Sequence, residues 1–263
     1  MRAPVNGIEI EYRVDGRVKA PAVVLSHSLA TNMSMWGPQV PVLARDYLVI
    51  SYDMRGHGRS DAPAGPYDFR MLAQDVIGLL DHLDIDRAAF VGISIGGMIG
   101  QMLAIHHRSR LAAALLCSTT SQISEQVRGL WDQRIAAVEA GGMASQVAAT
   151  LDRWFTEPYR AAHPDIMDWV GEMIGTTPVA GFVGCGRAIQ NLDVAGGLGR
   201  ITTPTLVLPG EKDPGMPPTV SEAVHRAIAG SEFAIVPDAS HLANIQQPEA
   251  FNRLAGRFLR KHL

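Results

Sequence analysis

The chain has 263 residues, of which 47% are hydrophobic and 19% charged, and its formal net charge is −3. This length and apolar content exclude a disordered chain and are typical of one large globular domain or one domain with an insertion. There is no basic tract, which argues against a nucleic-acid binder, and no apolar run reaches the roughly 18 residues that a membrane span requires.

The N-terminus and the cysteines indicate the compartment. Residues 1–7 lack the charged and apolar regions of a signal peptide. Cys117 and Cys185 lie far apart in the chain and form neither a CxxC pair nor a disulfide framework. We therefore expect a cytoplasmic protein in which both cysteines are buried thiols.

Strand and helix patterns alternate through the first half of the chain. Residues 8–14 alternate apolar and polar side chains, as a half-buried strand does. Residues 69–83 carry apolar side chains at helical spacing. Short apolar runs, typical of strands covered on both faces, occur at 21–26, 47–52, 88–92 and 112–117. The alternation predicts an α/β fold with a mostly parallel, doubly wound sheet.

The middle of the chain is predicted to be a helical insertion. No strand pattern occurs from 121 to 198, and the helical patterns there are interrupted at Gly141-Gly142, Pro158, Pro164 and Gly175. Strand patterns resume at 205–209 and 233–236, and a last amphipathic helix is predicted over 248–259. We expect a core of residues 1–120 and 199–263, with residues 121–198 inserted as a cap.

The strongest motif is Gly92-Ile93-Ser94-Ile95-Gly96, which follows a predicted strand and opens a predicted helix. It fits G-x-S-x-G, the nucleophile elbow, in which a sharp turn presents a serine hydroxyl above a sheet. Such a turn needs very small residues two before and two after the serine, and Gly92 and Gly96 meet this need. Ser94 is the predicted nucleophile, and a glycine-rich turn that serves packing alone is the alternative.

A serine nucleophile needs a histidine base, which follows the serine in chains with this motif. Three histidines follow the predicted insertion. His225 falls within a predicted helix and His262 lies next to the last residue, whereas His241 lies in a loop after the last predicted strand. His241 is therefore the predicted base.

The base needs an acid to orient it. Asp213 follows the predicted strand at 205–209, and the distance along the chain to His241 leaves room for one helix and one strand. Glu211 is the runner-up, and Asp238 lies too close to His241 in the sequence to reach its imidazole from behind. Asp213 is the predicted acid.

Attack on a carbonyl creates an oxyanion that needs preorganised N–H donors. The amide of Ile95, next to the nucleophile, is one predicted donor, and the amide of Leu29, in the loop after the strand at 22–26, is the other. His27 is expected to brace this loop, with a catalytic role as the alternative. His57 lies in a charged turn and lacks a second ligand at metal-like spacing, and neither an H-E-x-x-H motif nor a carboxylate cluster occurs, so no metal is expected.

The elbow, the Asp-x-Arg-Gly-His-Gly-x-Ser turn at 53–60, Asp213 and His241 together resemble the α/β-hydrolase superfamily over essentially the whole chain. Further stretches resemble the 3-oxoadipate enol-lactonase family, namely Ser28 to Trp36, Arg55 to Tyr67, Gly96 to Gln101, Trp131 to Arg134, Gly141 to Met143, Arg153 to Thr156 and Asn244 to Phe251. The resemblance implies a cofactor-free serine hydrolase that opens 3-oxoadipate enol-lactone to 3-oxoadipate in protocatechuate and catechol catabolism.

That substrate carries a carboxylate, so the resemblance implies a cation in the pocket. Arg134, beside Trp131 in one of the similar stretches, is the candidate, and Trp154 is a further candidate contact. A surface arginine is the alternative. The only expected partner is a small lactone or ester; neither nucleic acid nor membrane is expected, and the oligomeric state stays open.

The chain also departs from the pattern of that family. Ile93 and Ile95 flank Ser94 where Leu and Met are usual, and Gln246 stands where Glu is frequent. Three other functions stay open: a carboxylesterase or lactonase with another substrate and perhydrolase side activity, a C–C hydrolase, and a ligand receptor that reuses the fold.

Overall fold

The structure is a computed structural model that describes residues 1–263. Its sheet has eight strands in the order β1-β2-β4-β3-β5-β6-β7-β8. The strands are β1 (Arg2–Val5), β2 (Ile8–Gly16), β3 (Ala22–Ser26), β4 (Leu48–Tyr52), β5 (Ala88–Ile93), β6 (Leu111–Cys117), β7 (Thr205–Leu208) and β8 (Glu232–Phe233). β1 and β2 form an antiparallel edge, and β3 to β8 run parallel. The predicted α/β class is confirmed.

Helices fill the connections between the strands. They are α1 (Val40–Leu43), α2 (Phe69–His82), α3 (Ile95–His106), α4 (Glu125–Gly141), α5 (Val147–Trp154), α6 (Glu157–Ala162), α7 (Pro164–Thr176), α8 (Val179–Gln190), α9 (Pro218–Ala227), α10 (Ala243–Gln246) and α11 (Pro248–His262). α3 packs against α2, β5 and β6, and α11 also contacts β6. β5 is buried along its whole length, as expected of a strand covered on both faces.

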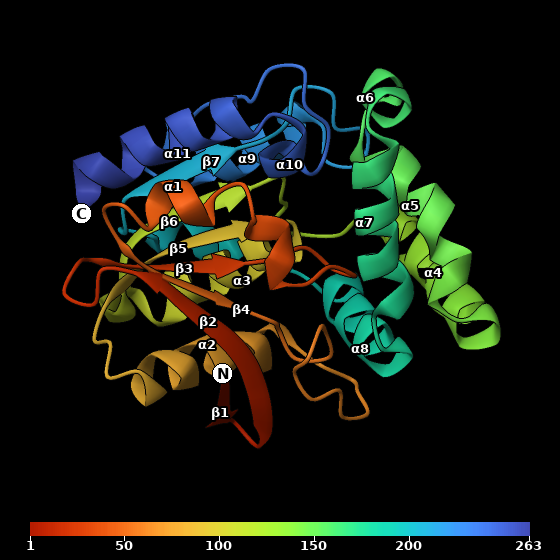
Figure 1. The fold of residues 1–263 in the computed structure, drawn as a ribbon, viewed down its shortest axis with the longest axis horizontal. Coiled ribbons are helices and arrows are strands. Elements are labelled where there is room, and N and C mark those ends of the chain that lie inside the picture. The colour runs from red at the N-terminus through yellow and green to blue at the C-terminus, as the bar shows by residue number, and fades with distance from the viewer.

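α4 to α8 lie between β6 and β7 in the chain, without an intervening strand, and we call residues 125–190 the helical block. Figure 1 shows the helical block beyond one end of the sheet, the end toward which β3 points. The loops that follow the parallel strands emerge at this end, where α/β proteins bind their ligands. The helical block thus faces the functional edge of the sheet.

Three elements end elsewhere than the sequence patterns predict. The pattern at 233–236 yields only β8 and an isolated bridge between Val236 and Gly210, because Pro209 before that bridge has no N–H to donate to the ladder. Gly175 does not interrupt α7. The helix ends at Thr176, because Pro178 disfavours the helical conformation of Thr177, the residue before it. α11 continues to His262, where a basic last turn complements the helix dipole.

Candidate active site

Ser94 lies at the tight turn between β5 and α3, with φ 58° and ψ −116°. This conformation is strained for a residue that has a side chain. A Cβ on Gly92 would stand 2.2 Å from the carbonyl oxygen of Gly96, and one on Gly96 would stand 2.4 Å from that of Ser26. Glycine at both positions therefore permits the turn, which leaves Ser94 8% exposed at the edge of the sheet.

Asp213 follows β7 and His241 follows β8, and their side chains are hydrogen-bonded. His241 Nδ1 lies 2.6 Å from Asp213 Oδ2, while Asp213 Oδ1 accepts the backbone N–H groups of Gly215 and Met216, each at 2.9 Å. Burial by itself raises the pKa of Asp213, but His241 and these hydrogen bonds outweigh it and hold the pKa below its usual value. The ionised carboxylate thus fixes the Nδ1 proton and leaves Nε2 to act as a base.

The other two acids considered for this role face elsewhere. Glu211 accepts a hydrogen bond from the Asp238 amide at 2.9 Å, and Asp238 pairs with Lys212 at 2.5 Å. Neither is hydrogen-bonded to His241. No hydrogen bond joins Ser94 Oγ to His241 Nε2 in this structure, and such bonds are often long before a substrate binds.

The two predicted oxyanion donors come from separate segments. Ile95 is the first residue of α3, a position whose N–H has no partner within the helix. Leu29 lies in the loop after β3, and its N–H has no acceptor in the protein. This loop packs against the elbow, since a Cβ on Gly96 would stand 3.0 Å from the His27 carbonyl oxygen. Both amides are available to an incoming oxygen atom.

His27 and His57 are fully buried, and their rings lie 5.3 Å apart. Burial lowers the pKa of both, to about 4 for His57, so both imidazoles are neutral at pH 7. His27 Nε2 accepts the Met54 N–H at 2.9 Å, and His57 Nε2 accepts the Ala30 N–H at 3.0 Å. Both basic nitrogens are already engaged, so these rings brace loops and do not compete with His241.

Trp154 connects His241 to the helical block. Its ring stacks on the imidazole with the centroids 6.1 Å apart and the planes 19° apart. The Trp154 carbonyl accepts the Leu242 amide at 3.3 Å. Trp154, which the sequence predicts as a contact of the substrate, thus lies at the end of α5 against the predicted base.

Gln246 makes a second connection between the His241 loop and the helical block. Its buried Oε1 accepts the amides of Ser240 at 3.0 Å and Thr156 at 3.4 Å. Its Nε2 donates to Thr156 Oγ1 at 2.6 Å and to the Asp238 carbonyl at 3.0 Å. The sequence singles out Gln246 only as a departure from the family pattern, because its partner Thr156 lies 90 residues away in the chain.

Arg134 of α4 is a half-buried cation without an ion-pair partner. Its guanidinium carbon lies 4.3 Å from the centroid of the Trp131 ring and 5.7 Å from that of Phe182, and its buried Nε has no hydrogen-bond partner. Burial, followed by the charge of Arg153, lowers the pKa of Arg134. Arg153 directly precedes Trp154 in the chain, and Trp154 stacks on His241. The pair of cations Arg134 and Arg153 is thus linked through Trp154 to the predicted base. A half-buried cation without a partner favours an anionic ligand.

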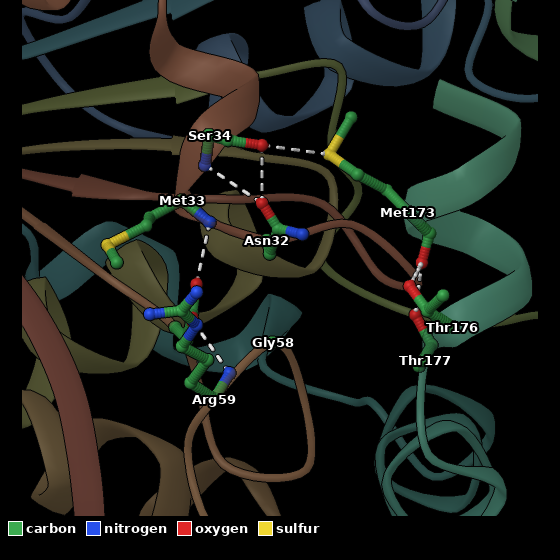
Figure 2. A pocket seen from close by; sticks show the side chains of 9 residues that line it. Asn32, Met33, Ser34, Gly58, Arg59, Met173, Thr176 and Thr177 are labelled. Atoms are coloured by element: carbon green, nitrogen blue, oxygen red, sulfur yellow. Dashed lines mark hydrogen bonds between the residues drawn. The ribbon is translucent and has the colours of Figure 1, made fainter. Parts of the chain in front are cut away.

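A cavity of about 410 Å³ opens between the loop after β3 and the end of α7 (Figure 2). Its lining consists of Asn32, Met33, Ser34, Asp53, Gly58, Arg59, Met173, Thr176 and Thr177. Figure 2 shows Ser34 Oγ directed at Met173 Sδ, 3.3 Å away, where this loop meets the helical block. None of the predicted catalytic side chains lines this cavity, so it is separate from the candidate active site.

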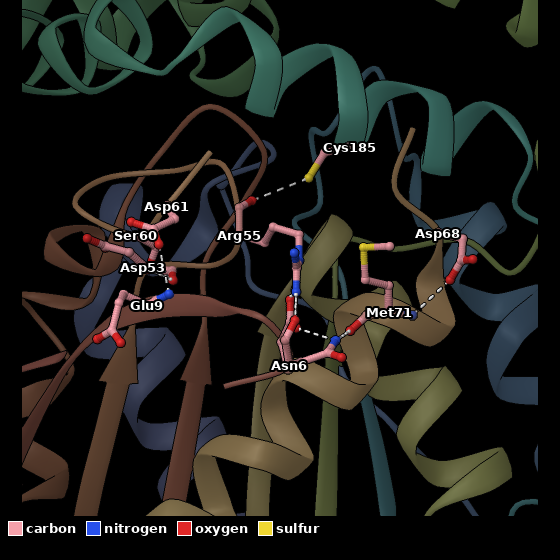
Figure 3. Close-up of polar contacts among 10 residues, drawn as sticks. Asn6, Glu9, Asp53, Arg55, Ser60, Asp61, Asp68, Met71 and Cys185 are labelled. Carbon is pink, nitrogen blue, oxygen red and sulfur yellow. Dashed lines mark hydrogen bonds and ion pairs between the residues drawn. The ribbon is translucent and has the colours of Figure 1, made fainter. Parts of the chain in front are cut away.

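The charged turn after β4 is anchored by a buried ion pair that the sequence patterns did not reveal (Figure 3). Arg55 donates to the two carboxylate oxygens of Asp75 at 2.7 and 2.9 Å, and Asn6 donates to Asp75 at 2.8 Å. The Cys185 thiol of α8 lies 3.9 Å from the Arg55 carbonyl oxygen. The charge of Arg55 is thus structural, and α8 contacts this turn.

The structure shows neither a cluster of side chains that could bind a metal ion nor a helix that could span a membrane. No three His, Cys, Asp or Glu side chains are grouped so as to hold a metal ion. No helix combines the length and the apolar character needed to cross a bilayer.

Comparison with known proteins identifies the family. Residues 21–248 match the family model described as the alpha/beta hydrolase fold. The chain is 36% identical to 3-oxoadipate enol-lactonase 2 of Acinetobacter baylyi, over 93% of this chain and 91% of that protein. The crystal structure of the enol-lactonase from Burkholderia xenovorans LB400 has a TM-score of 0.96 at 38% identity, over 99% of this chain and 100% of that one.

A thermophilic esterase from Thermogutta terrifontis, solved with malate bound, has a TM-score of 0.94 at 28% identity over the full length of both chains. The match therefore extends through the sheet and the helical block alike. The chain belongs to the α/β-hydrolase family and is a carboxylic ester hydrolase that resembles the 3-oxoadipate enol-lactonases.

Proposed function

We propose that this protein is a serine hydrolase that opens a lactone ester, with 3-oxoadipate enol-lactone as its substrate in the breakdown of protocatechuate and catechol. The observation that carries the proposal is the buried Asp213–His241 hydrogen bond, which lies at the edge of the sheet where the Ser94 elbow also emerges. The similarity to named enol-lactonases supports the choice of substrate.

In the acylation step, Ser94 Oγ attacks the lactone carbonyl carbon and its proton passes to His241 Nε2. Asp213 stabilises the resulting imidazolium. The amides of Ile95 and Leu29 donate to the oxyanion of the tetrahedral intermediate. The ester C–O bond then breaks, and the leaving enolate oxygen takes the proton from His241, which gives an enol that tautomerises to the ketone.

In the deacylation step, His241 removes a proton from a water molecule, and the hydroxide attacks the acyl carbon bound to Ser94. Collapse of the second tetrahedral intermediate breaks the bond to Ser94 Oγ, which recovers its proton from His241. The product is a dicarboxylate, because the opened ester adds a carboxylate to the one that the lactone already carries.

In this proposal residues 121–198 act as a cap on a core of residues 1–120 and 199–263. The stacking of Trp154 on His241 supports this division, because a residue of the helical block forms one wall of the reaction site. A cap that excludes water strengthens the electrostatic interactions within the site.

Arg134 is the proposed partner of the substrate carboxylate, with Trp131 and Trp154 lining the site. The absence of an acidic neighbour for the Arg134 guanidinium supports this role. A carboxylate at that position would replace the hydration that burial removes.

The test compares the enol-lactone with a neutral ester of similar size in Arg134→Gln. Loss of the charge contact raises KM for the lactone about 10- to 100-fold, which corresponds to about 1.4 to 2.7 kcal/mol, and leaves KM for the neutral ester unchanged. Arg128→Gln on the same helix is the matched control, because Arg128 is exposed. Equal losses on both substrates would contradict the carboxylate contact, and fast turnover of the neutral ester alone would favour a carboxylesterase.

A further inference from the structure

The Ser28 carbonyl group is held by three donors. It accepts the Thr31 hydroxyl at 2.7 Å, His27 Nδ1 at 2.8 Å and the Thr31 amide at 3.3 Å. Ser28, Thr31 and His27 are each at least 99% buried. The direction of this carbonyl is therefore fixed by the fold and not by solvent.

This carbonyl shares its peptide group with the N–H of Leu29. In a planar trans peptide, the C=O and the N–H point in opposite directions. Because the Ser28 oxygen is turned toward Thr31 and His27, the Leu29 N–H is turned away from both, and it has no acceptor in the protein. A buried amide without a partner is costly unless a ligand or water completes it.

The next peptide group is fixed as well. The Ala30 N–H donates to His57 Nε2 at 3.0 Å, and His57 Nδ1 donates to the Arg55 carbonyl at 3.1 Å. Ala30 has φ 59°, a backbone conformation that residues other than glycine rarely adopt. The loop thus stays in a strained shape because two consecutive peptide groups are held by buried side chains, the first by Thr31 and His27 of the loop itself and the second by His57 from the turn after β4.

We infer that Thr31, His27 and His57 are positioning residues that aim the Leu29 amide at the oxyanion. This inference rests on the proposed function, since it gives Leu29 the role of a donor in ester hydrolysis. Thr31 acts by fixing the Ser28 carbonyl together with His27, and His57 acts by fixing the peptide that follows Leu29.

Thr31→Val tests the inference, because it removes the hydroxyl and keeps the shape of the side chain. With p-nitrophenyl acetate as the ester probe, kcat falls at least about 10-fold, below the 10²- to 10³-fold loss typical of a deleted oxyanion donor, and KM stays within about twofold. Thr31→Ser restores kcat because it retains the hydroxyl. Thr205→Val is the matched control: Thr205 is equally buried and donates to a backbone carbonyl, but at the far end of β7.

A second readout separates aim from stability. A trifluoromethyl ketone forms a tetrahedral adduct whose oxygen occupies the oxyanion position, so its inhibition weakens in Thr31→Val in parallel with kcat, while inhibition by acetate does not. Thermal midpoints of the two valine variants check that both are folded. If Thr31→Val has the same kcat and inhibitor affinity as Thr205→Val, while Ser94→Ala is inactive, the positioning role is overturned. Equal hydrolysis by wild type and Ser94→Ala overturns the proposed function and the positioning role together.

Discussion

Ser94 occupies a backbone conformation that costs about 1 to 3 kcal/mol and persists only when its surroundings over-determine it. Its N–H donates to the Cys117 carbonyl at 2.9 Å, and its own carbonyl accepts the Met98 amide at 3.0 Å and Thr119 Oγ1 at 3.1 Å. These bonds run to β6, to the following turn of α3 and to the loop after β6. The hydroxyl of the proposed nucleophile is thus presented by a rigid frame.

Asp213→Asn tests the role of the acid. An amide in place of the carboxylate favours the wrong tautomer of His241 and cannot stabilise its charged form, so kcat/KM falls by about 10⁴, the effect seen when the acid of another serine triad is replaced in this way. Steady-state kinetics with the enol-lactone provides the measurement. Asp238→Asn serves as the control, because the Asp238 carboxylate pairs with Lys212 at the surface. A loss of less than tenfold in Asp213→Asn would contradict the assignment.

At the scale of elements, the His241 loop is held to the α5–α6 junction by Gln246. Gln246→Ala removes four hydrogen bonds from a buried site, which predicts a loss of about 2 to 4 kcal/mol in the free energy of unfolding together with a lower kcat. Urea unfolding and kinetics on the same preparation measure both. Gln126→Ala, at an exposed position of α4, is expected to change neither. Unchanged kcat in Gln246→Ala would show that the loop keeps its place without this side chain.

The contact between α8 and the turn after β4 requires glycine on both sides. A Cβ on Gly181 would stand 1.8 Å from the Gly56 carbonyl oxygen, so Gly181→Ala is predicted to destabilise the protein by about 3 kcal/mol or more. Gly129→Ala in α4 meets no atom within 4 Å and is predicted to stabilise it by up to about 1 kcal/mol. Urea unfolding compares the two, and similar effects of both substitutions would contradict the close approach of α8.

At the scale of the whole molecule, the buried histidines make stability depend on pH. The pKa of His57 is lowered to about 4 from the ordinary value near 6.5, and that of His27 is lowered as well, both chiefly by burial. Between pH 4 and 6.5 the unfolded chain binds more protons than the folded one, so the free energy of unfolding rises with pH. The contribution that the neutral histidines make to stability is lost as the pH falls from about 6.5 to 4.

His57 alone is predicted to remove about 3 kcal/mol over that window. Urea unfolding at pH 7, 6 and 5 measures the slope, and His57→Gln reduces it to the part that His27 contributes, because glutamine does not titrate. His106→Gln, at an exposed position, keeps the slope of the wild type. A wild-type free energy of unfolding that is constant from pH 7 to 5 would contradict the account.

The sequence predicts most of the fold and the order of the site residues along the chain, because both depend on local signals. The elbow needs glycine at fixed positions, and the buried strands appear as apolar runs. The connections made by Gln246 to Thr156, by Arg55 to Asp75 and by Trp154 to His241 could not be predicted. Each joins segments distant in the sequence, and neither spacing nor composition specifies such a contact. The pattern at 233–236 predicts a longer strand than β8, because the N–H that Pro209 lacks belongs to the neighbouring strand and leaves no signal in residues 233–236.

Ser94 is the proposed nucleophile that opens the enol-lactone ring. The most direct measurement follows the ultraviolet absorbance of freshly generated 3-oxoadipate enol-lactone with wild type and Ser94→Ala in parallel. We expect a wild-type kcat/KM of at least about 10⁴ M⁻¹s⁻¹ and no enzymatic decay with Ser94→Ala. Decay at the uncatalysed rate with the wild type, or equal rates with both proteins, would contradict this role of Ser94.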